Sequence, residues 1–327
     1  MKVAVVGVGN MGKNHTRIYS TLKNVELVAI CDSNKKLGKE VGKQYGVPFY
    51  EDYLALLENN KLDAVSIVVP TILHKEIAIE FIKHKVNVLV EKPLADTSSA
   101  AIDIVRAAKK YNVKLLVGHI ERYNPATTRL LDLIKKKYFG DVIAINSTRV
   151  GLFPPQISDV SVVTDLAVHD MDIISKIAGR QPDRVFAVGG STFTNMHHDH
   201  AEIILDYGNF SGFVQVNWTT PVKIRKLTVT GTKGYVELNY ITQKLSVYKR
   251  EYKLTAPKKF SEFVVKFGEP EKKRVRINKK EPLRAEIENF IDSISGIAKL
   301  KVSGEEGVEA VKLADRVISS IKTGRIT

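Results

Sequence analysis

Cysteine, tryptophan and long apolar runs are scarce in this sequence. It contains one cysteine, Cys31, and one tryptophan among 327 residues. No apolar run approaches the roughly 20 residues that cross a bilayer. A single cysteine excludes an internal disulfide framework and is typical of a reducing compartment. The opening run after Lys2 is short and broken by glycine, unlike a secretory signal. We therefore expect a cytoplasmic protein with no membrane partner.

Acidic residues are also outnumbered, with 36 Asp and Glu against 50 Lys and Arg, for a net charge of +14. The basic residues do not form one stripe, since residues 135–137 and 271–280 lie far apart in the chain. No nucleic-acid-binding motif accompanies them, so we expect no nucleic-acid partner. We interpret the charge as solvated faces and helix C-termini whose positive field favours anionic cofactors and substrates.

The first 120 residues alternate apolar runs with helical patterns, which predicts a doubly wound parallel sheet in an N-terminal Rossmann domain, 1–120. The expected strands are Lys2–Val6, Val25–Ile30, Val47–Tyr50 (at an edge), Leu62–Val69, Asn87–Val90 and Lys114–Val117, and the expected helices are Met11–Leu22, Ile72–His84 and Ser98–Lys110.

The spacing of apolar residues changes after Ile120, and alternating segments dominate later in the chain. This predicts a second, α+β domain over 121–327 with a large, mostly antiparallel open sheet. One sheet face would pack on helices, and the other would be free for solvent or a partner subunit, so we expect a homodimer or homotetramer. The expected strands are Ala201–Tyr207, Phe210–Trp218, Ile224–Thr230, Tyr235–Asn239 and Lys244–Tyr248, the expected helices are Asn124–Lys137, Thr164–Ala178, Leu283–Ile294 and Glu305–Ile321, and Pro257–Lys280 is expected to be a charged loop.

The segment GVGNMG (7–12) matches the glycine pattern of dinucleotide-binding turns. It lies between a predicted strand and helix, and Asp32 follows at the end of the next strand. Gly7 would make the tight turn, Gly9 would admit the pyrophosphate, and Gly12 would let the helix pack on the strand. A carboxylate at position 32 binds ribose hydroxyls and repels a 2′-phosphate, which favours NAD over NADP.

Two further segments carry candidate chemistry. Lys92 follows the fifth strand at the carboxyl edge, where doubly wound sheets bind ligands. In TDLAVHDMDII, Asp165, His169 and Asp172 fall on one face of a helix, and an imidazole suits removal of an alcohol proton. A solvated lysine and an exposed His–Asp pair are the plainer alternatives, and the residues alone leave both open.

Five motifs together resemble the glucose–fructose oxidoreductase / inositol dehydrogenase / MocA family over nearly the whole chain. They are GVGNMG (7–12), VVPTILH (68–74), EKP (91–93), GHIERYNP (118–125) and DLAVHDMD (165–172). The resemblance implies NAD-dependent hydride transfer from a sugar-like alcohol, with His169 as general base and Lys92 and Asp165 positioning the alcohol. The cofactor-binding residues that it implies, including those named above, are Gly7, Gly9, Asn10, Met11, Gly12, Asp32, Pro70, Thr71, His74, Glu91, Lys92 and His119. Thr71 stands where the family usually has Asn.

Within the family, GHIERYNP and WTTPVKIRKL (218–227) most resemble nucleotide-sugar members that oxidise C3 of UDP-N-acetylglucosamine to a 3-keto sugar. That resemblance adds Arg122, Tyr123 and Asn124 to Lys92, Asp165 and His169 as substrate-binding residues. An arginine suits bidentate phosphate binding, and an interdomain salt bridge is an equal alternative for Arg122.

Three other functions remain open: a dehydrogenase of a free sugar or polyol such as inositol, a reductase of a biliverdin-like or imine substrate, and a non-catalytic NAD-binding protein. The Asp165–His169 pair favours an alcohol over an imine, and the addition of Lys92 favours an enzyme. The segment MHHDH (196–200) brings three histidines together, but it joins two predicted strands and adjacent strand residues face opposite ways. We expect a solvated loop and no metal site.

Overall fold

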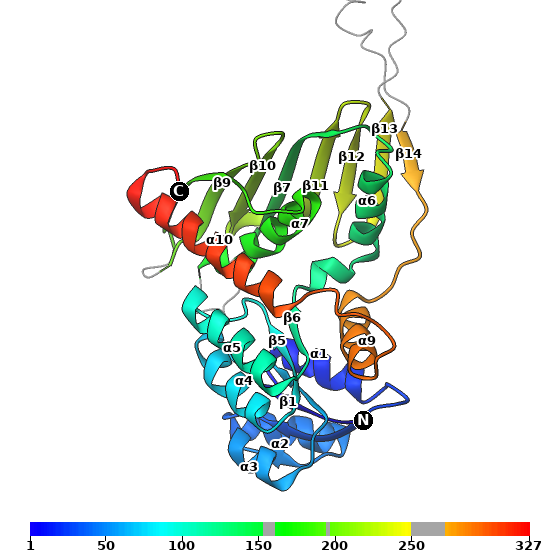
Figure 1. The fold of residues 1–327 in the computed structure, drawn as a ribbon, viewed down its shortest axis with the longest axis vertical. Coiled ribbons are helices and arrows are strands. Elements are labelled where there is room, and N and C mark those ends of the chain that lie inside the picture. Colours follow the sequence, from blue (N-terminus) through cyan, green and yellow to red (C-terminus); the bar gives the residue numbers. More distant parts are fainter. Residues whose placement is uncertain (153–160, 194–196, 250–271) are drawn as a thin grey trace, which may run out of the picture.

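The computed structural model describes residues 1–152, 161–193, 197–249 and 272–327, which form two parts stacked end to end (Figure 1). The N-terminal part is built on a six-stranded parallel sheet in the order β3-β2-β1-β4-β5-β6. Its strands are β1 (Lys2–Val6), β2 (Glu26–Cys31), β3 (Phe49–Tyr50), β4 (Ala64–Ile67), β5 (Asn87–Glu91) and β6 (Leu115–Gly118). All six predicted strands are confirmed, including the edge position of β3.

Helices cover this sheet because its strands are apolar on both faces, as parallel strands require. Residues Val3–Val6 of β1, for example, are all buried. The helices are α1 (Asn10–Tyr19), α2 (Lys35–Tyr45), α3 (Tyr53–Asn59), the 3₁₀ turn η1 (Thr71–Leu73), α4 (His74–Lys83) and α5 (Ser98–Tyr111). The sequence analysis did not predict α2 and α3. Helix α2 has many charged side chains and few apolar ones, and α3 is only seven residues long.

The C-terminal part is an eight-stranded sheet in the order β14-β13-β12-β11-β7-β10-β9-β8, antiparallel except where β7 pairs with β10. The strands are β7 (Val142–Leu152), β8 (Arg184–Gly190), β9 (His200–Asp206), β10 (Ser211–Asn217), β11 (Thr219–Gly231), β12 (Gly234–Asn239), β13 (Lys244–Lys249) and β14 (Lys272–Val275). This confirms the mostly antiparallel open sheet. Residues 272–275, expected in a charged loop, pair with β13 instead, and 257–271 lie outside the described residues.

One face of the large sheet is covered by α6 (Pro125–Lys135), α7 (Val168–Ala178) and α10 (Gly304–Thr323) (Figure 1). On β10, Val214 and Val216 point into this core, whereas Phe213 faces the opposite side and is 44% exposed. The alternation expected for a one-sided antiparallel sheet is therefore present.

The two hydrophobic cores do not divide the chain at a single point. Helix α9 (Pro282–Ile294) returns to pack on α1, and its residues Ile287 and Phe290 are fully buried in the N-terminal core (Figure 1). Helix α10 contacts both α5 and β8, so it spans the two parts. Together α9 and α10 fix the N-terminal sheet against the C-terminal one. In the described residues no helix is long and apolar enough to cross a membrane.

Candidate active site

The glycine turn between β1 and α1 has the geometry that its sequence predicts. Gly7 has φ +87°, and a Cβ there would lie 2.4 Å from the carbonyl oxygen of Val68. A Cβ on Gly12 would lie 1.8 Å from the carbonyl oxygen of Gly7, so only glycine permits this packing of helix on strand. A Cβ on Gly9, by contrast, would meet no atom within 4 Å.

The open space at Gly9 faces the N-terminus of α1, where no side chain caps the first turn. Free N–H groups and the helix dipole at such a position attract phosphate. Asn10 and Met11 lie in this first turn. The residues present therefore fit the pyrophosphate of a dinucleotide.

Asp32 lies beside the glycine turn at the end of β2. Its carboxylate accepts hydrogen bonds from the backbone N–H of Val8 at 2.7 Å and of Asn34 at 2.8 Å. It lines a cavity of about 340 Å³ together with Gly7, Gly9 and Pro70. Three more acidic residues line the same cavity: Glu51, Asp52 and Glu76. Lys35 pairs with Glu51 at 2.7 Å. The cavity wall is therefore acidic where a ribose would lie, which disfavours a 2′-phosphate.

His74 lies at the start of α4 and connects two loops at the edge of the sheet. Its buried ring nitrogens lie 3.0 Å from the carbonyl oxygens of Pro93 and Val69. Burial lowers the pKa of this imidazole. Thr71, just before it, is also buried. His74 thus holds the loop after β4 against the loop that contains Lys92.

Lys92 is the first residue after β5, in a Lys92–Pro93 cis peptide. Its Nζ donates to the Asp165 carboxylate at 2.8 Å and to the Asp165 carbonyl oxygen at 2.9 Å. Both side chains are 16% exposed, so the pair is shielded yet accessible. Asp165 belongs to the π-helical turn η3 (Val163–Ala167), which continues into α7, where the sequence analysis assumed a regular α-helix. The structure brings Lys92 and Asp165 together across the two parts of the molecule.

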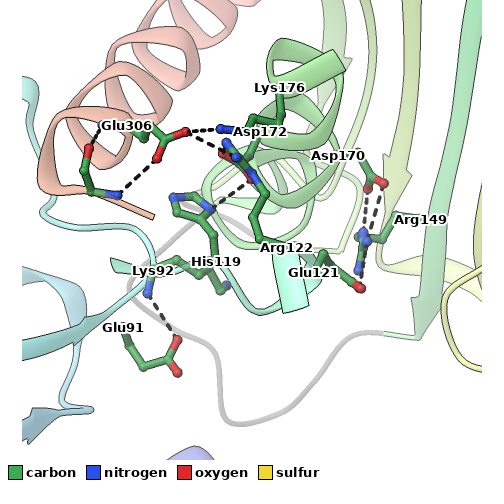
Figure 2. A network of polar contacts seen from close by, with 11 residues as sticks. Glu91, Lys92, His119, Glu121, Arg122, Arg149, Asp170, Asp172, Lys176 and Glu306 are labelled. Atoms are coloured by element: carbon green, nitrogen blue, oxygen red, sulfur yellow. Dashed lines mark hydrogen bonds and ion pairs between the residues drawn. The ribbon is translucent and has the colours of Figure 1, made fainter. Parts of the chain in front are cut away.

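His169 and His119 contribute imidazoles next to this ion pair. Burial, followed by the positive charges of Lys92 and Arg149, lowers the pKa of His169 well below its usual value. The pKa of His119 is also lowered, mainly by burial. Nδ1 of His169 and Nε2 of His119 are buried without a hydrogen-bond partner among the described residues. Nδ1 of His119 faces the Asp172 carboxylate at 4.0 Å (Figure 2). The two unpartnered nitrogens are suited to contact a bound ligand.

Glu91 fixes the backbone of Lys92 by a hydrogen bond. Its carboxylate accepts from the backbone N–H of Lys92 at 3.1 Å (Figure 2). The same carboxylate lies 3.1 Å from Nε2 of His15. The other nitrogen of His15 lies 3.1 Å from the Ser66 hydroxyl, which also contacts the Tyr19 hydroxyl. The sequence analysis missed His15, Ser66 and Tyr19, since nothing in their spacing indicates that three elements converge there.

Arg122, expected near the phosphates of the substrate, binds protein carboxylates instead. Its Nε and Nη2 donate to Asp172 at 2.5 and 2.7 Å, and its Nη1 donates to Glu306 at 3.2 Å (Figure 2). The structure therefore shows a salt bridge to protein carboxylates, as in the alternative, but its partners Asp172 and Glu306 lie in the same predicted domain as Arg122. Tyr123 donates to Asn289 at 2.9 Å, and Asn124 caps α6. All three side chains are buried, and their assignment to the substrate-binding set stays a prediction.

Arg149 forms a second buried ion-pair cluster that the sequence analysis missed. It lies on β7, and its guanidinium donates to Asp170 and, through Nη2, to Glu121 at 3.0 Å (Figure 2). It also stacks on Tyr240, with 4.9 Å from its Cζ to the ring centroid. Asp170 is fully buried and immediately follows His169 on α7. This cluster fixes the first turn of α7 against the large sheet.

Two histidines of the MHHDH segment, His197 and His198, line a cavity that also borders Thr71 and Pro93. In the described part of the segment, 197–200, the carboxylate of Asp199 lies 2.8 Å from Nδ1 of His200 and accepts from the backbone of Thr192 and Phe193. No group of three potential ligands suited to a metal ion occurs among the described residues.

Two family models match the chain. The first describes an oxidoreductase family with an NAD-binding Rossmann fold and matches residues 1–119. The second describes the C-terminal alpha/beta domain of the same oxidoreductase family and matches residues 132–327. The chain belongs to the Gfo/Idh/MocA family. It is therefore an oxidoreductase that uses NAD, and the cofactor predicted from the glycine turn and Asp32 is confirmed.

Family members of different specificity resemble this chain. UDP-N-acetylglucosamine 3-dehydrogenase of Acidithiobacillus ferrooxidans is 26% identical over 97% of this chain and 96% of its own. A solved structure of that enzyme has a TM-score of 0.87 and covers 98% of this chain and 97% of its own, at 25% identity. Inositol 2-dehydrogenase of Rubrobacter xylanophilus is 28% identical over 58% of this chain and 56% of its own.

Replacing Asp32 by alanine tests the ribose assignment. We expect NAD affinity to fall about tenfold, because a charged hydrogen-bond acceptor is lost, while NADP affinity rises or stays constant. Titration of intrinsic fluorescence with each cofactor measures both. Asp103→Ala, which removes an exposed carboxylate from α5, is the control. An unchanged NAD/NADP ratio in Asp32→Ala contradicts the assignment.

Proposed function

We propose that this protein oxidises a secondary alcohol of a nucleotide sugar, C3 of UDP-N-acetylglucosamine or a close analogue, to the keto sugar. The observation that carries the proposal is the Lys92–Asp165 ion pair beside the neutral imidazole of His169. The full-length similarity to a UDP-N-acetylglucosamine 3-dehydrogenase supports the nucleotide sugar over a free polyol, because the inositol dehydrogenase match covers little more than half of either chain.

Each of the three residues has one task. Bound NAD supplies the acceptor for the hydride that leaves the carbinol carbon with its electron pair. His169 accepts the hydroxyl proton, for which it must be neutral, as its lowered pKa provides. Lys92 donates a hydrogen bond to the substrate oxygen, and Asp165 holds the ammonium in place through its carboxylate and backbone carbonyl. The products are a ketone, NADH and protonated His169.

Turnover tests the proposal with Lys92→Met and His169→Ala against the wild type. Purified protein is mixed with NAD and UDP-N-acetylglucosamine, and NADH absorbance is followed. A second reaction contains a 2-keto acid as acceptor, and the hydroxy acid formed is measured, because NADH that stays bound would be reoxidised there. We expect kcat to fall about 10²- to 10⁴-fold in each variant, as loss of acid–base groups does. NAD affinity should remain nearly unchanged.

His84→Ala removes an exposed imidazole at the C-terminal end of α4 and serves as the control, with activity like the wild type. Faster turnover of myo-inositol than of any UDP-sugar would show that the substrate is a polyol and not a nucleotide sugar. Substantial activity left in Lys92→Met or His169→Ala would reject the roles given to them. Binding of NAD with no turnover of a UDP-sugar or of myo-inositol would reject the proposed dehydrogenase activity. Turnover of an imine in place of both alcohols would reject it as well.

We also propose that the uncovered face of the large sheet pairs with a second copy of the chain in a homodimer or homotetramer. Val188, Ile204 and Phe213 are 52%, 36% and 44% exposed on this face. Ile204 and Phe213 are directly paired across β9 and β10, so the apolar side chains are contiguous. An apolar sheet face of this kind is typical of a subunit interface.

Replacing Phe213 by glutamate should place charge in that interface and shift the protein to monomer. Multi-angle light scattering after size exclusion measures the mass of the wild type and the variant. Ile297→Glu, which changes a residue that is 76% exposed just after α9, should leave the mass unchanged. A monomeric wild type, or an unchanged mass in Phe213→Glu, contradicts the proposal.

A further inference from the structure

Three arginines lie close to the candidate active site, and two of them are fully committed to protein carboxylates. In Arg122, Nε and Nη2 form a bidentate pair with Asp172. In Arg149, the same two nitrogens bind Asp170. This edge of a guanidinium matches the two oxygens of a carboxylate or phosphate, and in both residues it is saturated.

Arg225 differs from the other two. Its Nη1 donates to the carbonyl oxygens of Val150 at 2.5 Å and of Ile224 at 2.8 Å, so both N–H groups of Nη1 are used. Nε and Nη2 have no acceptor among the residues that the structure describes. The backbone bonds thus fix the guanidinium while its bidentate edge stays available.

The position of Arg225 relates this edge to the reaction centre. Arg225 lies on β11 directly opposite Arg149 on β7, and so on the sheet face that carries the Arg149–Asp170 pair. Its charge is close enough to contribute to the lowered pKa of His169. A Cβ placed on Gly151 would lie 3.8 and 3.9 Å from Nη1 and Nη2, so the guanidinium lies beside Gly151 at ordinary contact distance.

The carboxylates near Arg225 do not neutralise its positive charge, because each is already paired with another cation. Like charges directly opposite one another in a sheet destabilise it, and Arg149 already binds Asp170 and Glu121. Asp165 contributes a third carboxylate nearby, but it pairs with Lys92. Lys223, two residues before Arg225, is exposed, and its Cα lies 3.8 Å from the same Cβ position on Gly151. The local excess of positive charge therefore favours an anionic ligand.

We propose that the Nε/Nη2 edge of Arg225 binds the anionic group of the substrate, with Lys223 contributing at the rim, and so selects charged sugars over neutral polyols. The inference rests on the proposed function, which it deepens by assigning the anion to a side chain. A diphosphate and a sugar carboxylate share the chemistry that this edge recognises, so the experiment includes both.

Binding to the NAD-saturated protein tests the proposal without turnover. Calorimetry measures the Kd of UDP and of glucuronate for the wild type and for Arg225→Gln, Arg225→Lys and Lys223→Gln. We expect the preferred anion to bind Arg225→Gln about 10- to 100-fold more weakly, as loss of a charged hydrogen-bond pair implies. Arg225→Lys should recover part of that loss, because it keeps the charge without the bidentate edge. Lys223→Gln should lose less than Arg225→Gln.

Arg184→Gln is the control, since Arg184 is an exposed arginine on β8 that pairs with Asp206, and it should bind like the wild type. In turnover, Arg225→Gln should raise KM for the anionic sugar with little change in kcat or in melting temperature. Tighter binding of UDP would identify a diphosphate as the group that Arg225 binds, and tighter binding of glucuronate would identify a sugar carboxylate. Equal affinity of wild type and Arg225→Gln for both anions overturns the proposal, as does failure of both to bind the wild type. Anion binding that depends on Arg225 without oxidation of any UDP-sugar would reject the proposed function and leave the anion site in place.

Discussion

The ion pair between Lys92 and Asp165 is the interaction on which the site depends, because it joins the two parts of the molecule at the reaction centre. Lys92 follows β5 of the Rossmann sheet, and Asp165 lies in η3 of the C-terminal part. The double contact to the carboxylate and carbonyl of Asp165 gives the ammonium one position. A shielded pair of this kind pays part of its desolvation cost with these hydrogen bonds.

The surrounding polar clusters hold the Lys92 ammonium and its partner Asp165 in fixed positions. On the Rossmann side, Glu91 fixes the backbone of Lys92. On the other side, Arg122 and Arg149 bind Asp172 and Asp170, which flank Met171 just beyond His169, and so hold α7 against its neighbours (Figure 2). Removal of either arginine would leave a buried carboxylate unpaired, which is strongly unfavourable. Burial, followed by the positive charges of Lys92 and Arg149, lowers the pKa of His169 and so keeps it neutral. Structural ion pairs thus contribute directly to the electrostatics of the proposed base.

The parts of the fold that depend on local geometry could be predicted from the sequence, and those that depend on distant partners could not. The turn at Gly7 and the carboxylate at Asp32 lie within one strand–helix–strand unit, so their spacing indicates a dinucleotide site. Strand β7 was missed because its inward residues include Ser147 and Arg149, which break the alternation of apolar and polar side chains. Asp170 and Glu121, on other elements, make a buried arginine acceptable there. Arg122 was given to the substrate because its partner Asp172 is 50 residues away.

The pH dependence of kcat/KM tests the central claim, that a neutral His169 beside the Lys92–Asp165 pair removes the alcohol proton. Because burial and neighbouring cations lower the pKa of His169 well below 6.5, it stays unprotonated at and above that pH. The account predicts a constant kcat/KM from about pH 8 down to about pH 6.5, with an acid limb only at lower pH, since this profile reports the base of the free enzyme. An acid limb centred at or above pH 6.5 would contradict the account, because the base would then be a group that is not held neutral in this way.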